Sequence, residues 1–208
     1  MFKSILRSDT EKLCAKEFDL LRQPSNPRLS ARSAGSEDLG NIYELIAKNV
    51  SFPVAPIEVM RFAMGVNRNN IIVFCRHGEV VGLYAMLMLT ASGLEALLTG
   101  EFDGRDPKVA HLAPRLEKPA AIYQWLVVAP GLVAEGFTHI SRFLRSPFYR
   151  SANLYMRAAS VSGSRISASL GYQPVPGPTH GLQRYVRLIN RADLARVSVI
   201  AETLPDAA

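Results

Sequence analysis

Cysteine is scarce in this chain, with only Cys14 and Cys75 among 208 residues. The two lie far apart in apolar surroundings, and neither belongs to a spacing typical of metal ligands or redox motifs. The pattern argues against a disulfide framework and indicates no metal site. We therefore expect both residues to be reduced thiols in the core of a cytoplasmic protein.

Long apolar runs are also missing. None reaches the roughly 18 residues that a membrane helix needs, and the apolar run in the basic first segment is too short for a secretory signal. No internal repeat or low-complexity tract is present. Apolar residues make up 48% and charged residues 20% of the chain, which is the balance of an ordinary globular protein. We expect no membrane partner.

The net charge of +6 suits an anionic ligand such as a nucleotide cofactor, and it also suits nucleic acid. The positive charge is scattered, however. Its densest clusters, 142–150 and 182–196, hold only a few arginines each. Nucleic-acid binding is therefore the least favoured reading, and we expect no nucleic-acid partner.

Periodicity and turn residues predict alternating strands and helices over most of the chain. The expected order is a strand at 28–35, helices at 36–49 and 57–66, a hairpin at 71–89, a helix at 90–100, a strand at 121–129, a helix at 138–144, a strand at 152–160, a helix at 161–171 and a closing hairpin at 172–189. Such alternation predicts an α/β fold with a mixed sheet and helices on both faces. This domain spans 28–189, between an N-terminal helical extension at 1–27 and a C-terminal tail at 190–208.

Local signals place several helix ends. Ser8 and Glu11 form a capping box before a short N-terminal helix, and Ser92 and Glu95 form another. Ser36 is expected to cap the helix at 36–49, whose apolar face holds Leu39, Ile42, Tyr43, Ile46 and Val50. Gly100 is expected to end the next helix. The long loop at 100–119 is then either functional or a cover for a sheet edge.

Three segments resemble the GNAT superfamily of N-acetyltransferases, and the element order agrees with that family over roughly 28–189. They are RLSARSAGSEDLGNIYELI at 28–46, LVVAPGLVAEGFTHISRFL at 126–144 and AASVSGSRISASLGYQPVP at 158–176. The last, with Leu170-Gly171-Tyr172 and then Pro174, is the most specific. The resemblance implies a mostly antiparallel central sheet of about six to seven strands. It also implies a splayed V between the fourth and fifth strands, here 121–129 and 153–159.

The resemblance further implies that acetyl-CoA is the acyl donor and places its pyrophosphate at the turn over 130–138. The basic residue of the family motif is replaced by Val133, and only one glycine, Gly136, is clear. Binding would then rest on backbone N–H groups at a helix start. The residues expected to contact the cofactor there are Val133, Ala134, Glu135, Gly136, Phe137 and Thr138. A plain strand-to-helix turn is the other reading. Ser160 and Arg165 are expected to contact the cofactor from the late helix, although Arg165 also suits an exposed helix position.

The resemblance assigns the chemistry to the strand before this turn. Its backbone at Leu126, Val127 or Val128 would polarise the thioester carbonyl, although these residues also suit a plain core. Gln124 stands at the position of the general base but cannot usefully accept a proton. His111, Glu101, Asp103 and Asp106 in the preceding loop are ionisable alternatives. His111 is the favoured base among them, although an ordinary surface loop position suits it better. Ser167 stands where many members carry a tyrosine as general acid.

The sequence therefore predicts an acyl-CoA-dependent N-acyltransferase, in which an amine of a small molecule or a protein attacks the donor directly in a ternary complex. Two alternatives stay open. One is a GNAT-fold CoA-binding or regulatory module without catalysis, and the other, less favoured, is an acyltransferase that uses acyl carrier protein. The first two helices and the loop at 100–119 are expected to frame the acceptor. Since family members often dimerise, a homodimer is one expected state.

Overall fold

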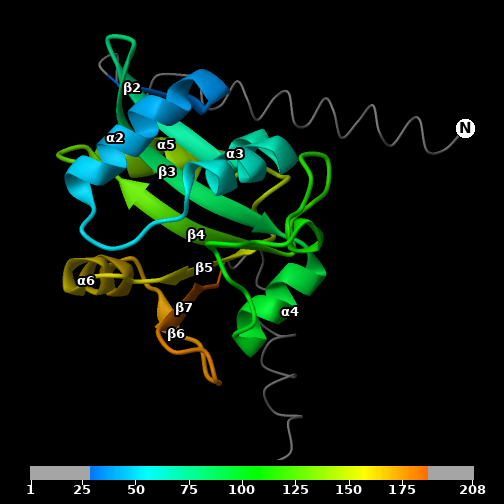
Figure 1. Ribbon diagram of the computed structural model, residues 1–208. Helices are drawn as coiled ribbons and strands as arrows, with labels where there is room; N and C mark the ends of the chain where they lie inside the picture. The colour runs from blue at the N-terminus through cyan, green and yellow to red at the C-terminus, as the bar shows by residue number, and fades with distance from the viewer. Residues whose placement is uncertain (1–28, 187–208) are drawn as a thin grey trace, which may run out of the picture.

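The computed structural model describes residues 29–186, which form a central sheet with helices on both faces (Figure 1). The strands are β1 Ser30–Ser33, β2 Ile71–Arg76, β3 Glu79–Leu89, β4 Ala121–Val128, β5 Asn153–Arg157, β6 Gln173–Pro174 and β7 Leu182–Tyr185. The helices are α2 Leu39–Asn49, α3 Ile57–Val66, α4 Ala91–Thr99, α5 Val133–Leu144 and α6 Val161–Ser169, with short 3-10 turns η1 Ser36–Asp38, η2 Arg68–Asn70 and η3 Val109–His111.

The seven described strands form one sheet in the order β1-β2-β3-β4-β5-β7-β6. Every neighbouring pair is antiparallel except β4 and β5, which run parallel. The β2–β3 hairpin turns at His77 and Gly78, whose φ angles of 52° and 90° are those that a tight two-residue hairpin turn requires. The predicted mixed, mostly antiparallel sheet is confirmed.

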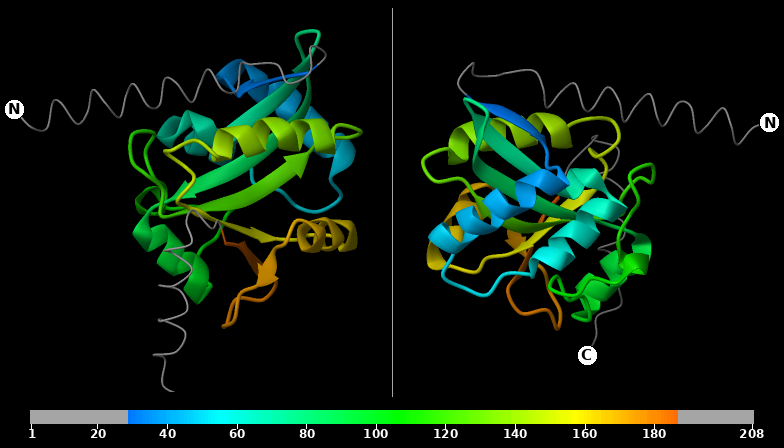
Figure 2. Two further views of the ribbon diagram at one scale, coloured as in Figure 1. Left: turned by 180° about the vertical axis from the view of Figure 1, so that it is seen from behind. Right: turned by 45° about the horizontal axis from the view of Figure 1, so that its top comes forward.

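Two helical layers cover the sheet, as Figure 2 shows from behind and from above. Alternate residues of β2 and β3 point to opposite faces, so each strand contributes to two cores. Ile71, Val73 and Leu83 pack with α2 and α3, whereas Ile72 and Phe74 pack with α5. The apolar runs of the central strands therefore reflect burial on both sides.

The start of α2 differs from the expectation that Ser36 caps it. Gly35 precedes a 3-10 turn instead, and the Asp38 carboxylate accepts a hydrogen bond of 2.7 Å from the Gly35 backbone N–H. Arg32 on β1 binds the same carboxylate through two nitrogens, at 2.5 and 2.8 Å. This hydrogen-bonded ion pair holds the pKa of Asp38 below its ordinary value. Tyr43, expected on the apolar face of the helix, is 41% exposed.

The start of α4 also differs from the expectation. Thr90, not Ser92, is its N-cap, because the Thr90 hydroxyl accepts the hydrogen bond from the Gly93 backbone N–H. Gly100 ends the helix with a φ of 86°, as predicted.

Cys75 is buried and free, and burial raises the pKa of its thiol. The expected N-terminal helix, Cys14 and the C-terminal tail lie outside the described residues.

Candidate functional site at the splayed strands

The parallel pairing of β4 with β5 stops halfway along β4. It runs from Ala121 opposite Asn153 to Gln124 opposite Met156, while β4 continues to Val128. Among the described residues, no strand pairs with that edge of β4 beyond Gln124. The two strands therefore separate into the V that the resemblance implied.

A β-bulge lies in β4 at this point. On the β3 side, Gln124 pairs with Met86 and Leu126 pairs with Ala85, which leaves Trp125 as an extra residue. A bulge bends the strand and increases its local twist. It also places Trp125 and Leu126 on the same face, where both pack against the α2–α3 core.

The opening between the strands holds a cavity of about 280 Å³, which we call the V cavity. One wall is β4 at 124–127, and the other is the end of β5 together with α6. Phe137 of α5 and Phe52 of the α2–α3 loop complete it. The V cavity thus lies against the partnerless edge of β4.

A second cavity of about 260 Å³, the loop cavity, opens at the mouth of the V. It is framed by the α2–α3 loop at 52–55 and by Asp103, Gly104 and Arg105 of the long loop. Six residues line both cavities, namely Phe52, Trp125, Leu126, Arg157, Ala158 and Ala159. A molecule in the loop cavity would therefore adjoin one in the V cavity.

Gln124 and Ser167, two of the three predicted catalytic residues, line the V cavity. The Oε1 atom of Gln124 accepts a hydrogen bond of 2.9 Å from the hydroxyl of Tyr172. Ser167 is 1% exposed, and its hydroxyl donates to the backbone carbonyl of Ser164 at 2.9 Å. Both polar groups already have a protein partner.

His111, the third predicted catalytic residue, lies away from the V. It ends η3, and its ring packs 5.9 Å from that of Phe102 between ring centroids. The next residue, Leu112, bridges Leu89, which pairs with the first residue of β4. Because the V opens at the opposite end of β4, the structure does not bring His111 together with Gln124 and Ser167. Of the four ionisable loop residues, only Asp103 lines a cavity at the V.

The expected pyrophosphate turn is shorter than predicted. Helix α5 begins at Val133, so Gly136, Phe137 and Thr138 lie inside the helix. The loop before it turns at Gly131, where φ is 69°. The N-cap residue, Leu132, makes no side-chain capping hydrogen bond. The first-turn N–H groups, which have no partner within a helix, therefore lack a side-chain cap.

Gly136 was expected in the turn, whereas the structure places it inside α5. It is buried, and its N–H donates to the Leu132 carbonyl at 2.8 Å. A Cβ atom added to Gly136 would lie 2.8 Å from the Phe74 ring on β2. The glycine therefore lets α5 approach the sheet. Glu135 is half-buried with its Oε2 atom covered by protein, and Thr138 is exposed.

The predicted residues of α6 divide into two groups. Ser160 caps the helix, accepts a hydrogen bond of 3.0 Å from the Gly163 N–H and lines the V cavity. Arg165 is exposed and lines neither cavity, which agrees with the reading of an ordinary surface position.

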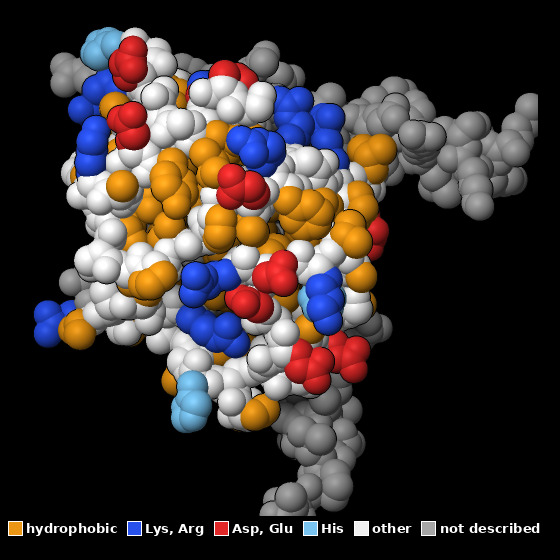
Figure 3. Space-filling model, in the orientation of Figure 1, with side chains coloured by type: hydrophobic (Ala, Val, Ile, Leu, Met, Phe, Trp, Pro, Cys, Tyr) orange, Lys and Arg blue, Asp and Glu red, His pale blue; other side chains and the backbone are white. Residues whose placement is uncertain are grey.

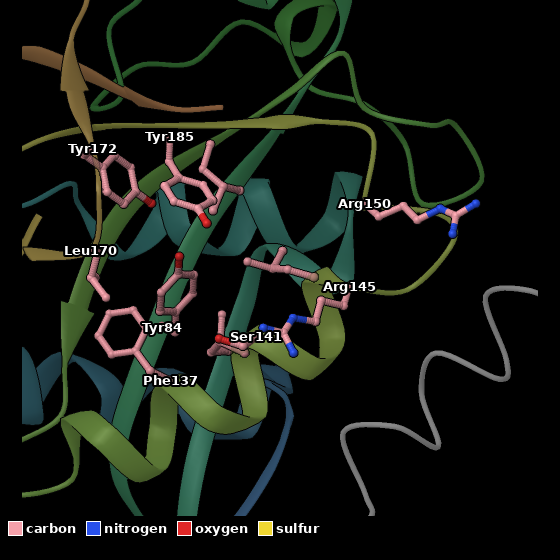
Figure 4. Close-up of a pocket in the computed structure, with 11 residues that line it drawn as sticks. Tyr84, Phe137, Ser141, Arg145, Arg150, Leu170, Tyr172 and Tyr185 are labelled. Carbon is pink, nitrogen blue, oxygen red and sulfur yellow. The ribbon is translucent and has the colours of Figure 1, made fainter. Parts of the chain in front are cut away.

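A third cavity, of about 540 Å³, lies under α5 and shares Phe137 and Leu170 with the V cavity. In Figure 4 the hydroxyl groups of Tyr84, Tyr172 and Tyr185 point toward one another within it. No sequence motif indicated this cluster, because β3, β7 and the end of α6 bring its members together. Tyr172 entered the sequence analysis only as part of the Leu170-Gly171-Tyr172 motif.

Within residues 29–186, no helix is long and apolar enough to cross a membrane. Over the same range, no three side chains of His, Cys, Asp or Glu come together as a metal site would require.

Comparison with known proteins finds similarity in structure but not in sequence. No family model and no curated protein matches the sequence. The PH1933 protein of Pyrococcus horikoshii OT3 has a TM-score of 0.50 at 10% identity, with 78% of this chain and 99% of that chain covered. The loading GNATL domain of CurA from Lyngbya majuscula has a TM-score of 0.49 at 15% identity, with 71% and 70% covered. The yncA protein of Salmonella typhimurium, solved with its cofactor acetyl-CoA, has a TM-score of 0.47 at 12% identity, with 87% and 99% covered.

At such identities the likeness concerns the fold alone. The sheet order, the single parallel pair among the described strands and the V at its end give this chain a GNAT-like fold.

Proposed function

We propose that this protein is an acyl-CoA-dependent N-acyltransferase, which transfers an acetyl group from acetyl-CoA to an amine bound at the same time. The observation that carries the proposal is the partnerless edge of β4 facing a cavity between separated strands. Backbone groups on such an edge hydrogen-bond to whatever extended chain enters beside them.

The V cavity has the chemistry to hold the pantetheine arm of coenzyme A. That arm is an extended chain with two amide groups, which can pair with the edge of β4 as a strand would. Apolar walls from Phe137, Ile166 and Leu170 suit its methylene groups. The loop at 129–132 leads into a helix start without a side-chain cap, where N–H groups can receive a pyrophosphate.

Bound acetyl-CoA would supply a thioester, whose carbonyl carbon is open to attack by an amine. We assign the polarisation of that carbonyl to backbone N–H groups of β4 at Leu126, Val127 or Val128. Val133, Ala134 and Glu135 would contribute backbone N–H groups at the start of α5. The loop cavity, which meets the V cavity at Trp125 and Leu126, would hold the acceptor.

Proton transfer in this site depends on few residues. Asp103 is the carboxylate that lines the loop cavity. We assign to it the binding of the acceptor amine in its protonated, ammonium form. Gln124 would hold a water or orient the acceptor, because an amide accepts no proton at neutral pH. Ser167 would donate to the departing thiolate only after its hydroxyl rotates away from the Ser164 carbonyl.

A CoA-binding module without catalysis is a second candidate, favoured by the engaged hydroxyl of Ser167. Titration calorimetry with acetyl-CoA, followed by release of free thiol in the presence of an amine panel, separates the two. Binding together with amine-dependent thiol release is expected. Binding without turnover on any amine would favour the module, and absence of binding would overturn both.

A further inference from the structure

The loop cavity carries charges of both signs beside the mouth of the V. Arg105 and Arg157 line it together with Asp103. Figure 3 shows basic and acidic side chains lying together on this face, below a band of hydrophobic side chains. Carboxylates attract a simple cationic amine and arginines repel it, so the two arginines favour an acceptor that also carries an anionic group.

Arg157 is the last residue of β5 and lines both cavities. It is half-buried, and its guanidinium lies near the hydroxyl of Tyr123, which is 8% exposed. Neither Arg157 nor Arg105 forms an ion pair with a carboxylate of the described residues. The fork of a guanidinium matches a carboxylate, which it binds through two parallel hydrogen bonds.

The position of Arg157 between the two cavities determines which kind of carboxylate compound would fit the site. Since Arg157 stands where the two cavities meet, an anion on it lies at the mouth of the V. In an α-amino acid one carbon separates the carboxylate from the amine, so an acid group on Arg157 leaves the nitrogen beside the V as well. The remaining walls of the loop cavity include Phe52, Val54 and Met60, which suit an apolar side chain.

We propose that the acceptor is an α-amino acid with an apolar side chain, with Arg157 binding its carboxylate and Asp103 its ammonium group. This rests on the proposed acyltransfer. The deprotonated nitrogen forms a bond to the thioester carbon, and the carbon–sulfur bond breaks. One proton of the original ammonium group ends on the sulfur of coenzyme A, and a second passes through Asp103 to water.

The test compares L-leucine with L-leucinamide, which keeps the amine and side chain but lacks the carboxylate. With acetyl-CoA held in excess, the unmodified protein should have the higher kcat/KM for L-leucine. Arg157→Gln should lower that value on the order of 100-fold, mainly through KM, and change the value for L-leucinamide little. Arg157→Lys should restore part of the loss. Arg61→Gln, an exposed change on α3, is the matched control and should alter neither substrate.

Two readings separate this inference from the proposed function. If the protein binds acetyl-CoA and acetylates amines but uses L-leucinamide as well as L-leucine, the assignment of Arg157 is wrong while the acyltransfer stands. If acetyl-CoA does not bind, the proposed function itself fails. The comparison of substrates on the unmodified protein decides the matter even if Arg157→Gln does not fold.

Discussion

The hydroxyl of Tyr172 donates a hydrogen bond to Oε1 of Gln124 across 2.9 Å. Gln124 is the last residue of β4 that pairs with β5, and Tyr172 follows the glycine that ends α6. The bond therefore ties the end of α6 to the point where the V opens. Gln124 lines the V cavity and Tyr172 the third cavity, so the same bond lies between the two.

Removing this hydrogen bond should cost stability. Tyr172→Phe keeps the ring, whose centroid lies 5.5 Å from that of Tyr185, and removes only the donor. We expect the free energy of unfolding to fall by about 1 kcal/mol. Urea unfolding of Tyr172→Phe, Gln124→Leu and the double variant measures the coupling. Strictly additive losses would show that the two side chains do not interact in solution.

Gly136 should matter for packing. Gly136→Ala places a methyl group 2.8 Å from the buried Phe74 ring, and we expect the free energy of unfolding to fall by about 1–3 kcal/mol. Gly65→Ala is the matched control, because Gly65 is also helical and has no heavy atom within 4 Å of an added Cβ. That change should stabilise the protein by up to about 1 kcal/mol. Equal effects of both changes in thermal or urea unfolding would refute the close contact of α5 with β2.

The Arg32–Asp38 pair should make stability depend on pH at the acid end. Its hydrogen bonds lower the pKa of Asp38 from the ordinary value of 3.8, so the stabilisation is present above that value. It is lost as pH falls through the lower pKa of the folded state. At pH 7, Asp38→Asn should lower the free energy of unfolding by about 2 kcal/mol, and the difference from the unmodified protein should shrink below pH 4.

Glu44→Gln controls for this experiment. Glu44 and Lys48 form a solvent-exposed pair at 3.5 Å, and such pairs contribute little. Glu44→Gln should lower the free energy of unfolding by less than about 0.5 kcal/mol at any pH. A loss for Asp38→Asn that does not change with pH would mean that packing of Asp38, and not its charge, stabilises the start of α2.

Filling the mouth of the V should block the acyl donor. Ala159 is exposed and lines both cavities, so Ala159→Trp adds bulk there without entering the core. We expect the affinity for acetyl-CoA to fall at least about tenfold in calorimetry, with the free energy of unfolding unchanged within about 0.5 kcal/mol. Ala168→Trp, on an exposed position of α6 that lines neither cavity, should leave binding intact. Undiminished binding by Ala159→Trp would place the donor elsewhere.

The sequence predicted the element order well because period-2 and period-3.6 patterns are local. The sequence-based prediction failed where contacts between residues far apart in the chain determine the local structure. Gly136 looked like a turn residue, since glycine disfavours helices, but Phe74, 62 positions earlier in the chain, leaves no room there for a side chain. The start of α5 was also missed, because Leu132 offers no capping side chain to signal it.

The ionisable residues of the loop at 100–119 were candidates because they precede β4 in the sequence, and that nearness does not indicate which end of the strand opens. His111 adjoins the beginning of β4, whereas the V lies at its end. The bulge at Trp125 was equally hidden, because it appears only when the register with β3 is known. Arg157 passed unremarked as one strand residue among others until the fold placed it between two cavities.

Trp125 is the only tryptophan in the chain, and its indole lies half-buried on the wall shared by both cavities. Its emission spectrum therefore reports on a single place in the molecule, the junction where donor and acceptor would meet. Arrival of either ligand should change the wavelength or the yield of that emission. Trp125 is therefore an intrinsic fluorophore at this junction. Stopped-flow fluorescence can follow the order of ligand binding without an attached dye.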